Sequence, residues 1–204
     1  MSPVQGRKKV HIASSREREI GAQIKMNAIE LLPEGWTLTD DMEVCEVFIS
    51  VMYDKLLTSE YVATRRCFNF HPGLLPDYRG SGAYSWALLN KENRTGVTLH
   101  EIDYHIDSGR IIATKEIDII ENDTAEALFA KSMRLIESLF MTYFTKLLTC
   151  DYDVRGNEGG HLYLRRHLEE QKDISHIVRA FTFKGKESCY WIDSTGEKHY
   201  MEWK

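Results

Sequence analysis

The sequence lacks the marks of a membrane-spanning, disulfide-bonded or nucleic-acid-binding chain. No apolar run approaches the length of a membrane helix, and residues 1–9 are polar and basic, without the apolar core of a signal peptide. A net charge of -5 argues against a large nucleic-acid partner, because such binding normally shows as a basic excess. The four cysteines are scattered without a C-x-x-C pair, so we expect reduced thiols in a cytoplasmic protein: Cys45, Cys67, Cys150 and Cys189.

The remaining composition is that of a globular chain. Its 204 residues suit one domain with a small appendage, and 43% hydrophobic with 28% charged residues is ordinary for such a domain. Of the histidines, His100 and His105 are interpreted as structural or loop polar groups. We predict no metal site, because these histidines show no ligand spacing: His11, His100, His105, His161, His167, His176 and His199.

Alternating strands and helices predict an α/β fold. Apolar patterns indicate strands over residues 10–13, 44–51, 66–71, 96–103 and 111–117. Helical patterns cover residues 17–32, 59–64, 83–90 and 123–147, the last with Asp123 as its N-cap. We therefore expect a Rossmann-like, mostly parallel sheet flanked by helices, with ligands bound outside the carboxyl ends of its strands.

The character of the chain changes near its end, so we expect an α/β domain over residues 1–150 and a C-terminal module over residues 151–204. The module is expected to hold a helix over residues 162–171 and strands over 177–183, 189–193 and 198–203, the last two forming a β-hairpin. A hairpin this small cannot bury its aromatic side chains alone, so it packs on the main domain or on a second subunit. We favour a homodimer that uses one or more of three residues: Trp191, Tyr200 and Trp203.

Two polar side chains lie at the end of the strand expected over residues 66–71. Asn69 and His71 are two residues apart, so they project from one face of that strand. Pro72 and Gly73 end the strand and leave both side chains at its carboxyl end. With a carboxylate from a separate loop, this set suits acyl transfer. The amide N–H binds an oxyanion, the imidazole moves a proton, and the carboxylate orients the imidazole.

The motifs around these residues resemble the folate-dependent formyltransferase family. The motif N-x-H-P-G-L-L-P-x-Y-R-G is followed by T-G-V-T-L-H and then by I-D-S-G. The order and spacing of these motifs are specific, and the resemblance covers residues 44–147. It implies that N10-formyltetrahydrofolate is the formyl donor, consumed as a co-substrate, and that the catalytic residues are Asn69, His71 and Asp107. The region before Asn69 is shorter than is usual in this family, so we expect a strand–helix unit to be missing or compressed.

The resemblance implies attack of an amine on the formyl carbon, which gives a tetrahedral oxyanion. We expect Asn69 and a protonated His71 to donate hydrogen bonds to that oxyanion. Asp107 is expected to accept from His71 and to raise the pKa of His71. The proton that the amine loses goes either to His71 or to an ordered water, and both acceptors stay open.

Binding residues for both substrates are also expected. By resemblance, the pterin ring of the folate lies between the loop after residues 44–51 and the loop before Asp107, among Met52, Tyr53, Lys55, Leu56, Leu57 and Tyr104. The acceptor is expected near three residues that offer a forked donor for phosphate and flat apolar rings: Tyr78, Arg79 and Trp86. Ordinary packing or a surface ion pair is the alternative interpretation of these three.

Several acceptors fit the resemblance, and we favour the amine of a sugar linked to dTDP or UDP. Residues 95–100 and 177–183 are similar to sugar N-formyltransferases. A glycinamide ribonucleotide formyltransferase fits the chain length, but residues 13–17 lack the glycine of its phosphate loop. A methionyl-tRNA formyltransferase normally adds a large β-barrel and a basic surface. The alternative of a different class is a non-catalytic module that binds folate or a nucleotide.

Overall fold

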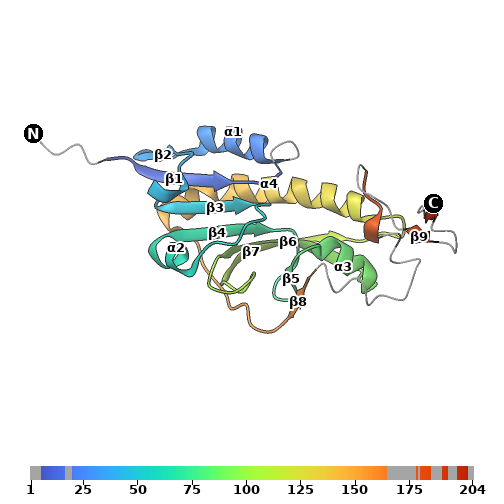
Figure 1. The fold of residues 1–204 in the computed structure, drawn as a ribbon. Coiled ribbons are helices and arrows are strands. Elements are labelled where there is room, and N and C mark those ends of the chain that lie inside the picture. The colour runs from blue at the N-terminus through green and yellow to red at the C-terminus, as the bar shows by residue number, and fades with distance from the viewer. Residues whose placement is uncertain are drawn as a thin grey trace, which may run out of the picture.

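The computed structural model has a six-stranded sheet at its centre (Figure 1). It describes residues 6–16, 20–164, 178, 180–184, 190–192 and 197–201. The strands lie in the order β2-β1-β3-β4-β6-β7. Their bounds are β1 Lys8–Ala13, β2 Trp36–Leu38, β3 Val47–Val51, β4 Arg66–His71, β6 Arg94–Glu101 and β7 Ile111–Asp118. The helices are α1 Ala22–Leu31, the 3-10 helix η2 Met42–Val44, α2 Ser59–Thr64, α3 Ala83–Leu89 and α4 Ala125–Thr149.

The sheet is mixed, and the predicted α/β fold is confirmed. Strands β2, β1, β3 and β4 run parallel to their neighbours, whereas β6 is antiparallel to β4 and β7 is antiparallel to β6. After β4 the chain forms the short strand β5 (Tyr78–Gly80) and then α3, which lies beyond the end of β4 instead of crossing back along the sheet (Figure 1). The next strand therefore starts at the same end of the sheet and runs in the opposite direction.

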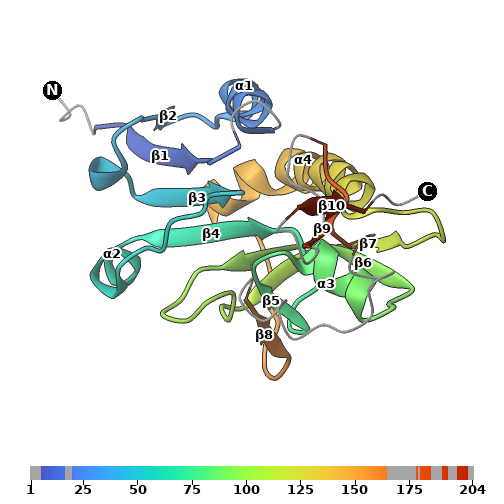
Figure 2. The same ribbon diagram turned by 45° about the vertical axis from the view of Figure 1, so that its right-hand side comes forward.

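The two faces of the sheet differ in their side chains. One face is apolar and packs on α1 and α4, through alternate residues of β3, β4 and β6. The core on this side is formed by Val47, Ile49, Val51, Phe68, Phe70, Val97 and Leu99 together with Ile136, Phe140 and Phe144 of α4. Figure 2 shows α1 and α4 along the upper side of these strands. The opposite face is apolar near the start of β4, where Phe48 and Cys67 belong to a second core cluster. It is polar near the end of β4, where Asn69 pairs with Ser50 and His100, and the site lies there.

Three local expectations in the first 150 residues need correction. The N-cap of α4 is Thr124, whose hydroxyl accepts from Ala127 N–H at 3.2 Å, and not Asp123. The carboxylate of Asp123 is buried and accepts instead from Lys131 Nζ at 2.6 Å, so it is turned away from the helix end. The strand expected from residue 44 begins later, because Met42–Val44 forms η2. The edge strand β2 was not predicted, since its three residues are too few to show an alternation of apolar and polar side chains.

The end of the chain differs more from the sequence prediction. Residues 161–163 form strand β8 (His161–Tyr163), not the start of a helix, and the rest of that expected helix lies outside the described residues. β8 pairs with β5 because Gly80, at φ +92°, lets the two backbones meet; a Cβ there would lie 2.2 Å from the Tyr163 carbonyl oxygen. Val178, Ala180 and Phe181 are helical, so the strand expected over residues 177–183 is wrong.

The C-terminal β-hairpin is confirmed. Strands β9 (Tyr190–Ile192) and β10 (Lys198–Tyr200) pair antiparallel. Residues 193–196 between the two strands lie outside the described residues, as do Trp203 and the side chain of Trp191. Over the part of the chain that is described, no helix combines the length and the apolar character needed to cross a membrane.

Candidate active site

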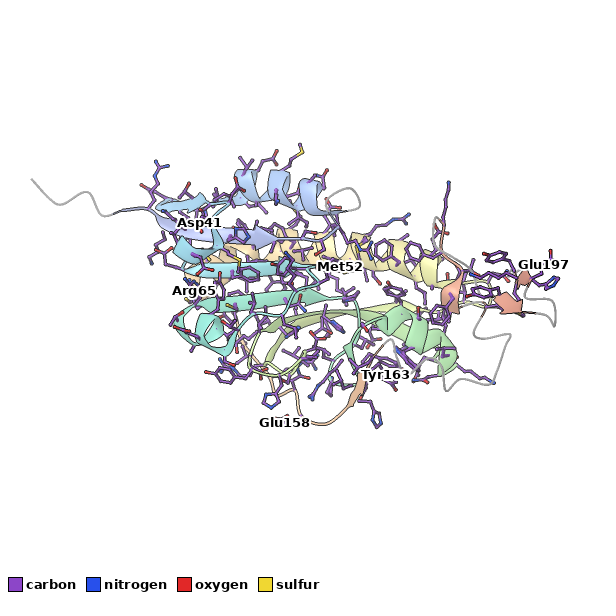
Figure 3. The ribbon with its side chains drawn as sticks, in the orientation of Figure 1. Asp41, Met52, Arg65, Glu158, Tyr163 and Glu197 are labelled. Carbon is purple, nitrogen blue, oxygen red and sulfur yellow. The ribbon has the colours of Figure 1, made fainter. Side chains whose placement is uncertain are left out.

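The predicted pair Asn69 and His71 lies at the carboxyl end of β4, on the face opposite α4. Phe68 and Phe70 alternate with them and point into the core on the other face. His71 is 3% exposed, whereas Asn69 is half-buried. Figure 3 shows Met52, which follows the neighbouring strand β3, at the same edge of the sheet. Both predicted side chains are therefore where parallel α/β sheets place their ligands.

A row of polar side chains crosses three strands and fixes the amide of Asn69. Ser50, Asn69 and His100 are direct register partners on β3, β4 and β6. Ser50 Oγ donates to Asn69 Oδ1 at 2.7 Å, and Asn69 Nδ2 lies 3.1 Å from His100 Nε2. His100 Nδ1 faces the Glu101 carbonyl oxygen at 2.6 Å, so Nδ1 carries a proton and donates to that oxygen. Asn69 Nδ2 therefore faces His100 and the loop that carries Asp107.

The carboxylate of Asp107 connects this row to His71. It accepts from Asn69 Nδ2 at 3.2 Å and from Gly80 N–H at 2.8 Å, and its oxygens lie 3.4 Å from His71 Nδ1 and from His100 Nε2. Burial alone would raise the pKa of Asp107, but the two imidazoles and the Gly80 N–H outweigh burial and hold this pKa well below its usual range. Asp107 is therefore ionised at neutral pH.

His71 lies between the Tyr78 carbonyl oxygen and the carboxylate of Asp107. Its Nε2 donates to the Tyr78 carbonyl oxygen at 2.6 Å, so in the neutral ring Nδ1, which faces Asp107, is the unprotonated nitrogen. Burial lowers the pKa of His71, and the opposing effect of Asp107 is smaller, so the net shift is downward. Asp107 acts on His71 in the expected direction, and the resting protonation state of His71 stays a prediction. In the neutral ring, Nδ1 can accept a proton that reaches it through Asp107.

A cavity of about 170 Å³ opens in front of these groups. Asn69, Asp107 and His100 line it, whereas His71 lies behind Asp107 and does not. Five of the six residues predicted to bind folate also line it: Tyr53, Lys55, Leu56, Leu57 and Tyr104. Met52 does not; it packs against the core on the other face of the sheet. A larger hollow of about 560 Å³ lies over residues 43–46 and 63–66, near the start of β4, and contains none of the predicted site residues.

The three residues predicted for the acceptor lie outside this cavity. Tyr78 and Trp86 are 6% and 3% exposed and pack with Tyr163, whose ring stacks on Tyr78 at a centroid distance of 5.2 Å. Arg79 is half-buried and donates through NH2 to the Asn157 carbonyl oxygen. In this structure the two aromatic residues present no open face, so packing explains them, and contact with an acceptor stays a prediction.

Comparison with known proteins identifies the family. The profile described as Formyl transferase matches residues 8–142. The chain belongs to the formyl transferase family. A curated relative, the GDP-perosamine N-formyltransferase of Brucella melitensis biotype 1, is 31% identical over 150 residues, covering 68% of this chain and 57% of its own length. The chain thus spans little more than half the length of that relative.

Solved structures share the fold of this formyl transferase. A sugar N-formyltransferase from Shewanella sp. FDAARGOS_354 matches with a TM-score of 0.84 and 20% identity, covering 96% of this chain and 97% of that chain. The N-formyltransferase from Helicobacter canadensis, solved with folinic acid and dTDP-3-aminofucose, matches with a TM-score of 0.71 and 20% identity, covering 88% and 82%. At this identity the two likenesses establish the shared fold.

Three residues of this formyl transferase's site were missed or misjudged from the sequence. His100 belongs to the polar row, although it was interpreted as a structural or loop group. Ser50 was predicted only as part of the strand over residues 44–51 and was given no role in the site. Asn157, in a glycine-rich segment, contacts the loop that carries Asp107. The alternation in T-G-V-T-L-H was the available signal for His100, since Thr98 and His100 fall on the polar face. No group of three or more candidate metal ligands occurs among the described residues.

Proposed function

We propose that this chain transfers a formyl group from N10-formyltetrahydrofolate to the amine of a nucleotide-linked amino sugar. The observation that carries the proposal is the cavity in which the Asn69 amide and the ionised Asp107 lie beside the residues expected to hold the pterin. Family membership supports the reaction class. The curated relative named for a GDP-linked amino sugar, and the fold neighbour solved with folinic acid and a dTDP-linked amino sugar, support this choice of substrates.

The reaction begins with attack of the acceptor amine on the formyl carbon, which forms a C–N bond and an oxyanion. Asn69 Nδ2 donates to that oxyanion, replacing one of its two present contacts, with Asp107 or His100. The proton of the attacking amine passes by way of Asp107 to Nδ1 of His71. Collapse of the intermediate breaks the bond to N10 of the folate, and the proton returns from His71 by way of Asp107 to that nitrogen. The products are the formamide of the sugar and tetrahydrofolate.

The folate is expected to bind with its pterin in the cavity. Leu56 and Tyr104 are 80% and 65% exposed and form an apolar rim that a flat ring would cover. The main chain near Lys55 and Leu57 would bind the polar edge of the ring. Contact of the acceptor with Tyr78 and Trp86 stays a prediction, and Arg79 stays a candidate for the acceptor phosphate.

We also propose two features of the whole protein. One is the division into a catalytic domain over residues 1–150 and a C-terminal module, in which residues 151–163 pack on the catalytic domain through β8. The other is a cytoplasmic homodimer that meets through the β9–β10 hairpin, where Tyr190 and Tyr200 are 37% and 56% exposed. Changing Trp191 and Trp203 together to Ser should shift sedimentation toward monomer. A wild-type chain that sediments as a monomer at tens of micromolar would contradict the dimer.

The experiment is a panel of UDP- and dTDP-linked amino sugars incubated with the purified chain and N10-formyltetrahydrofolate. The proposal predicts that one or more sugars gain a formyl group while tetrahydrofolate appears in equal amount. Transfer only to glycinamide ribonucleotide or to methionyl-tRNA would show that this molecule, and not an amino sugar, is the acceptor. Binding of folate without transfer to any amine would indicate a non-catalytic module and overturn the proposal.

A further inference from the structure

A side chain from the segment after α4 holds the loop of Asp107. Asn157 is 6% exposed, and its Nδ2 donates to the carbonyl oxygens of Asp107 at 3.0 Å and of Gly109 at 2.7 Å. The two N–H bonds of one amide thus bridge the first and last residues of the sequence Asp107-Ser108-Gly109. Because both acceptors are carbonyl oxygens, only the amide nitrogen can occupy this position, which fixes the orientation of the side chain.

Asn157 is itself held on both sides. Two residues earlier, Arg155 and Ile111 exchange a pair of backbone hydrogen bonds at 3.0 and 2.8 Å. Following Asn157, β8 pairs with β5, and the Asn157 carbonyl oxygen accepts from Arg79. The segment is therefore tied to β7 and to β5, so the amide of Asn157 is a rigid point of attachment for the loop.

Asp107 needs such an attachment because its backbone is strained. Its φ is +48°, a left-handed conformation that costs a non-glycine residue free energy and persists only where its surroundings enforce it. Gly109 is buried and packs closely on β6, where only glycine fits, since an added Cβ would lie 1.9 Å from the Glu101 carbonyl oxygen. The bridge from Asn157 thus ties the strained Asp107 to a residue that is already fixed.

We propose that Asn157 is a positioning residue for the formyl transfer: it holds the main chain of Asp107 so that the carboxylate stays between Asn69 and His71. The inference rests on the proposed function. Asn157 does not line the cavity, so it acts through Asp107 and not on substrate. Loss of the bridge lets Asp107 relax toward ordinary backbone angles, which withdraws its carboxylate from Asn69 Nδ2 and Gly80 N–H.

The test is a double-mutant cycle on the single-turnover transfer rate of the full chain with both substrates bound. Asn157→Ala should slow transfer by about 10- to 100-fold, as small misplacements of catalytic groups do, and change the Kd of each substrate by less than about 3-fold. In an Asp107→Ala background the same change should slow transfer by less than about 2-fold, because the group it positions is gone. Equal slowing in both backgrounds would overturn the proposal.

Two further variants separate positioning from general damage. Asn157→Ser keeps one donor in a smaller side chain and should transfer the formyl group at a rate between those of wild type and Asn157→Ala. This variant also tests the proposal if Asn157→Ala does not fold. Glu158→Gln changes an exposed neighbour, seen at the outer edge of the segment in Figure 3, and should leave rate and thermal stability unchanged. A rate for Asn157→Ser at or below that of a folded Asn157→Ala would contradict the role of the hydrogen bonds.

A measurement without turnover distinguishes this proposal from the proposed function. The NMR resonances of the His71 ring are sensitive to the position of Asp107, which faces Nδ1. They are also sensitive to His100 and to the Tyr78 carbonyl oxygen, which face the ring as well. In Asn157→Ala they should move toward their position in Asp107→Ala, whereas Glu158→Gln should leave them in place. A wild-type chain that transfers no formyl group would defeat the proposed function, while unchanged His71 resonances in Asn157→Ala would defeat the positioning role.

Discussion

Replacing Asp107 by asparagine removes the charge at the centre of the site while keeping its shape. The carboxylate now accepts from Asn69 Nδ2 and Gly80 N–H and lies 3.4 Å from His71 Nδ1. An amide of the same size has one acceptor oxygen, so it can serve one of these donors and turns an NH2 group toward the other. The imidazolium that forms when His71 takes up the proton then has no negative partner.

The distance between the Asp107 carboxylate and His71 Nδ1 sets how much Asp107→Asn slows the transfer. A carboxylate and an imidazolium at 3.4 Å attract by roughly 5 kcal/mol at an effective dielectric constant of about 20, which is an upper bound for the interaction lost. The amide dipole retains part of it. We therefore expect transition-state stabilisation to fall by about 3 kcal/mol, which lowers the transfer rate by about 100-fold.

The assay is the single-turnover rate across roughly pH 5 to 8, where histidine titrates. The wild-type rate should be level at neutral pH and fall as pH drops through the lowered pKa of His71, because only the neutral ring accepts a proton. In Asp107→Asn the rate should be lower throughout and the bend should move to still lower pH, since the carboxylate that raises this pKa is gone. A rate within about 3-fold of wild type, or a bend displaced upward, would refute the reasoning.

Three further predictions concern other residues. Asn69→Ala should lower turnover by at least ~100-fold with both substrates still bound, because an oxyanion donor is lost; binding and rate measured on one preparation check this. Ser50→Ala should slow transfer by about 5-fold without unfolding the chain, since one hydrogen bond of about 1 kcal/mol orients the Asn69 amide; unchanged single-turnover rates would contradict it. The pKa of His71 is lower in the folded than in the unfolded chain, so its contribution to the free energy of unfolding is present above an unfolded pKa of about 6.5 and is lost as pH falls through the folded pKa. The melting temperature of His71→Asn should therefore fall less on acidification than that of wild type.

Local patterns predicted the parts of the site that one strand determines. The period of two in β4 placed Asn69 and His71 on one face, and Pro72 and Gly73 placed them at its end. The Asp107 loop came from the resemblance of the surrounding motifs, not from any periodicity. The long apolar stripe of α4 was sufficient for its helix, but not for its cap, because Asp123 has a nearby lysine as a competing partner.

Features that depend on register or on distant segments could not be read from the chain. The polar row requires that Ser50, Asn69 and His100 be aligned across two strand pairs, one parallel and one antiparallel. The role of Asn157 depends on a bridge between residues 111 and 155 that no local pattern encodes. The lowered pKa of His71 follows from burial, which a sequence shows only as a tendency. The helical conformation of Val178, Ala180 and Phe181 accompanies a distant contact, in which Ser85 Oγ donates to the Ala180 carbonyl oxygen.

The most direct test of formyl transfer at this site uses N10-formyltetrahydrofolate labelled with carbon-13 in the formyl group. With a nucleotide-linked amino sugar, the wild-type chain should move the label into a formamide on the sugar, detected by carbon NMR. Asp107→Asn should bind the labelled donor equally well and form that product about 100-fold more slowly. Label that reaches no sugar amine, or that reaches it as fast in Asp107→Asn as in wild type, would contradict the account.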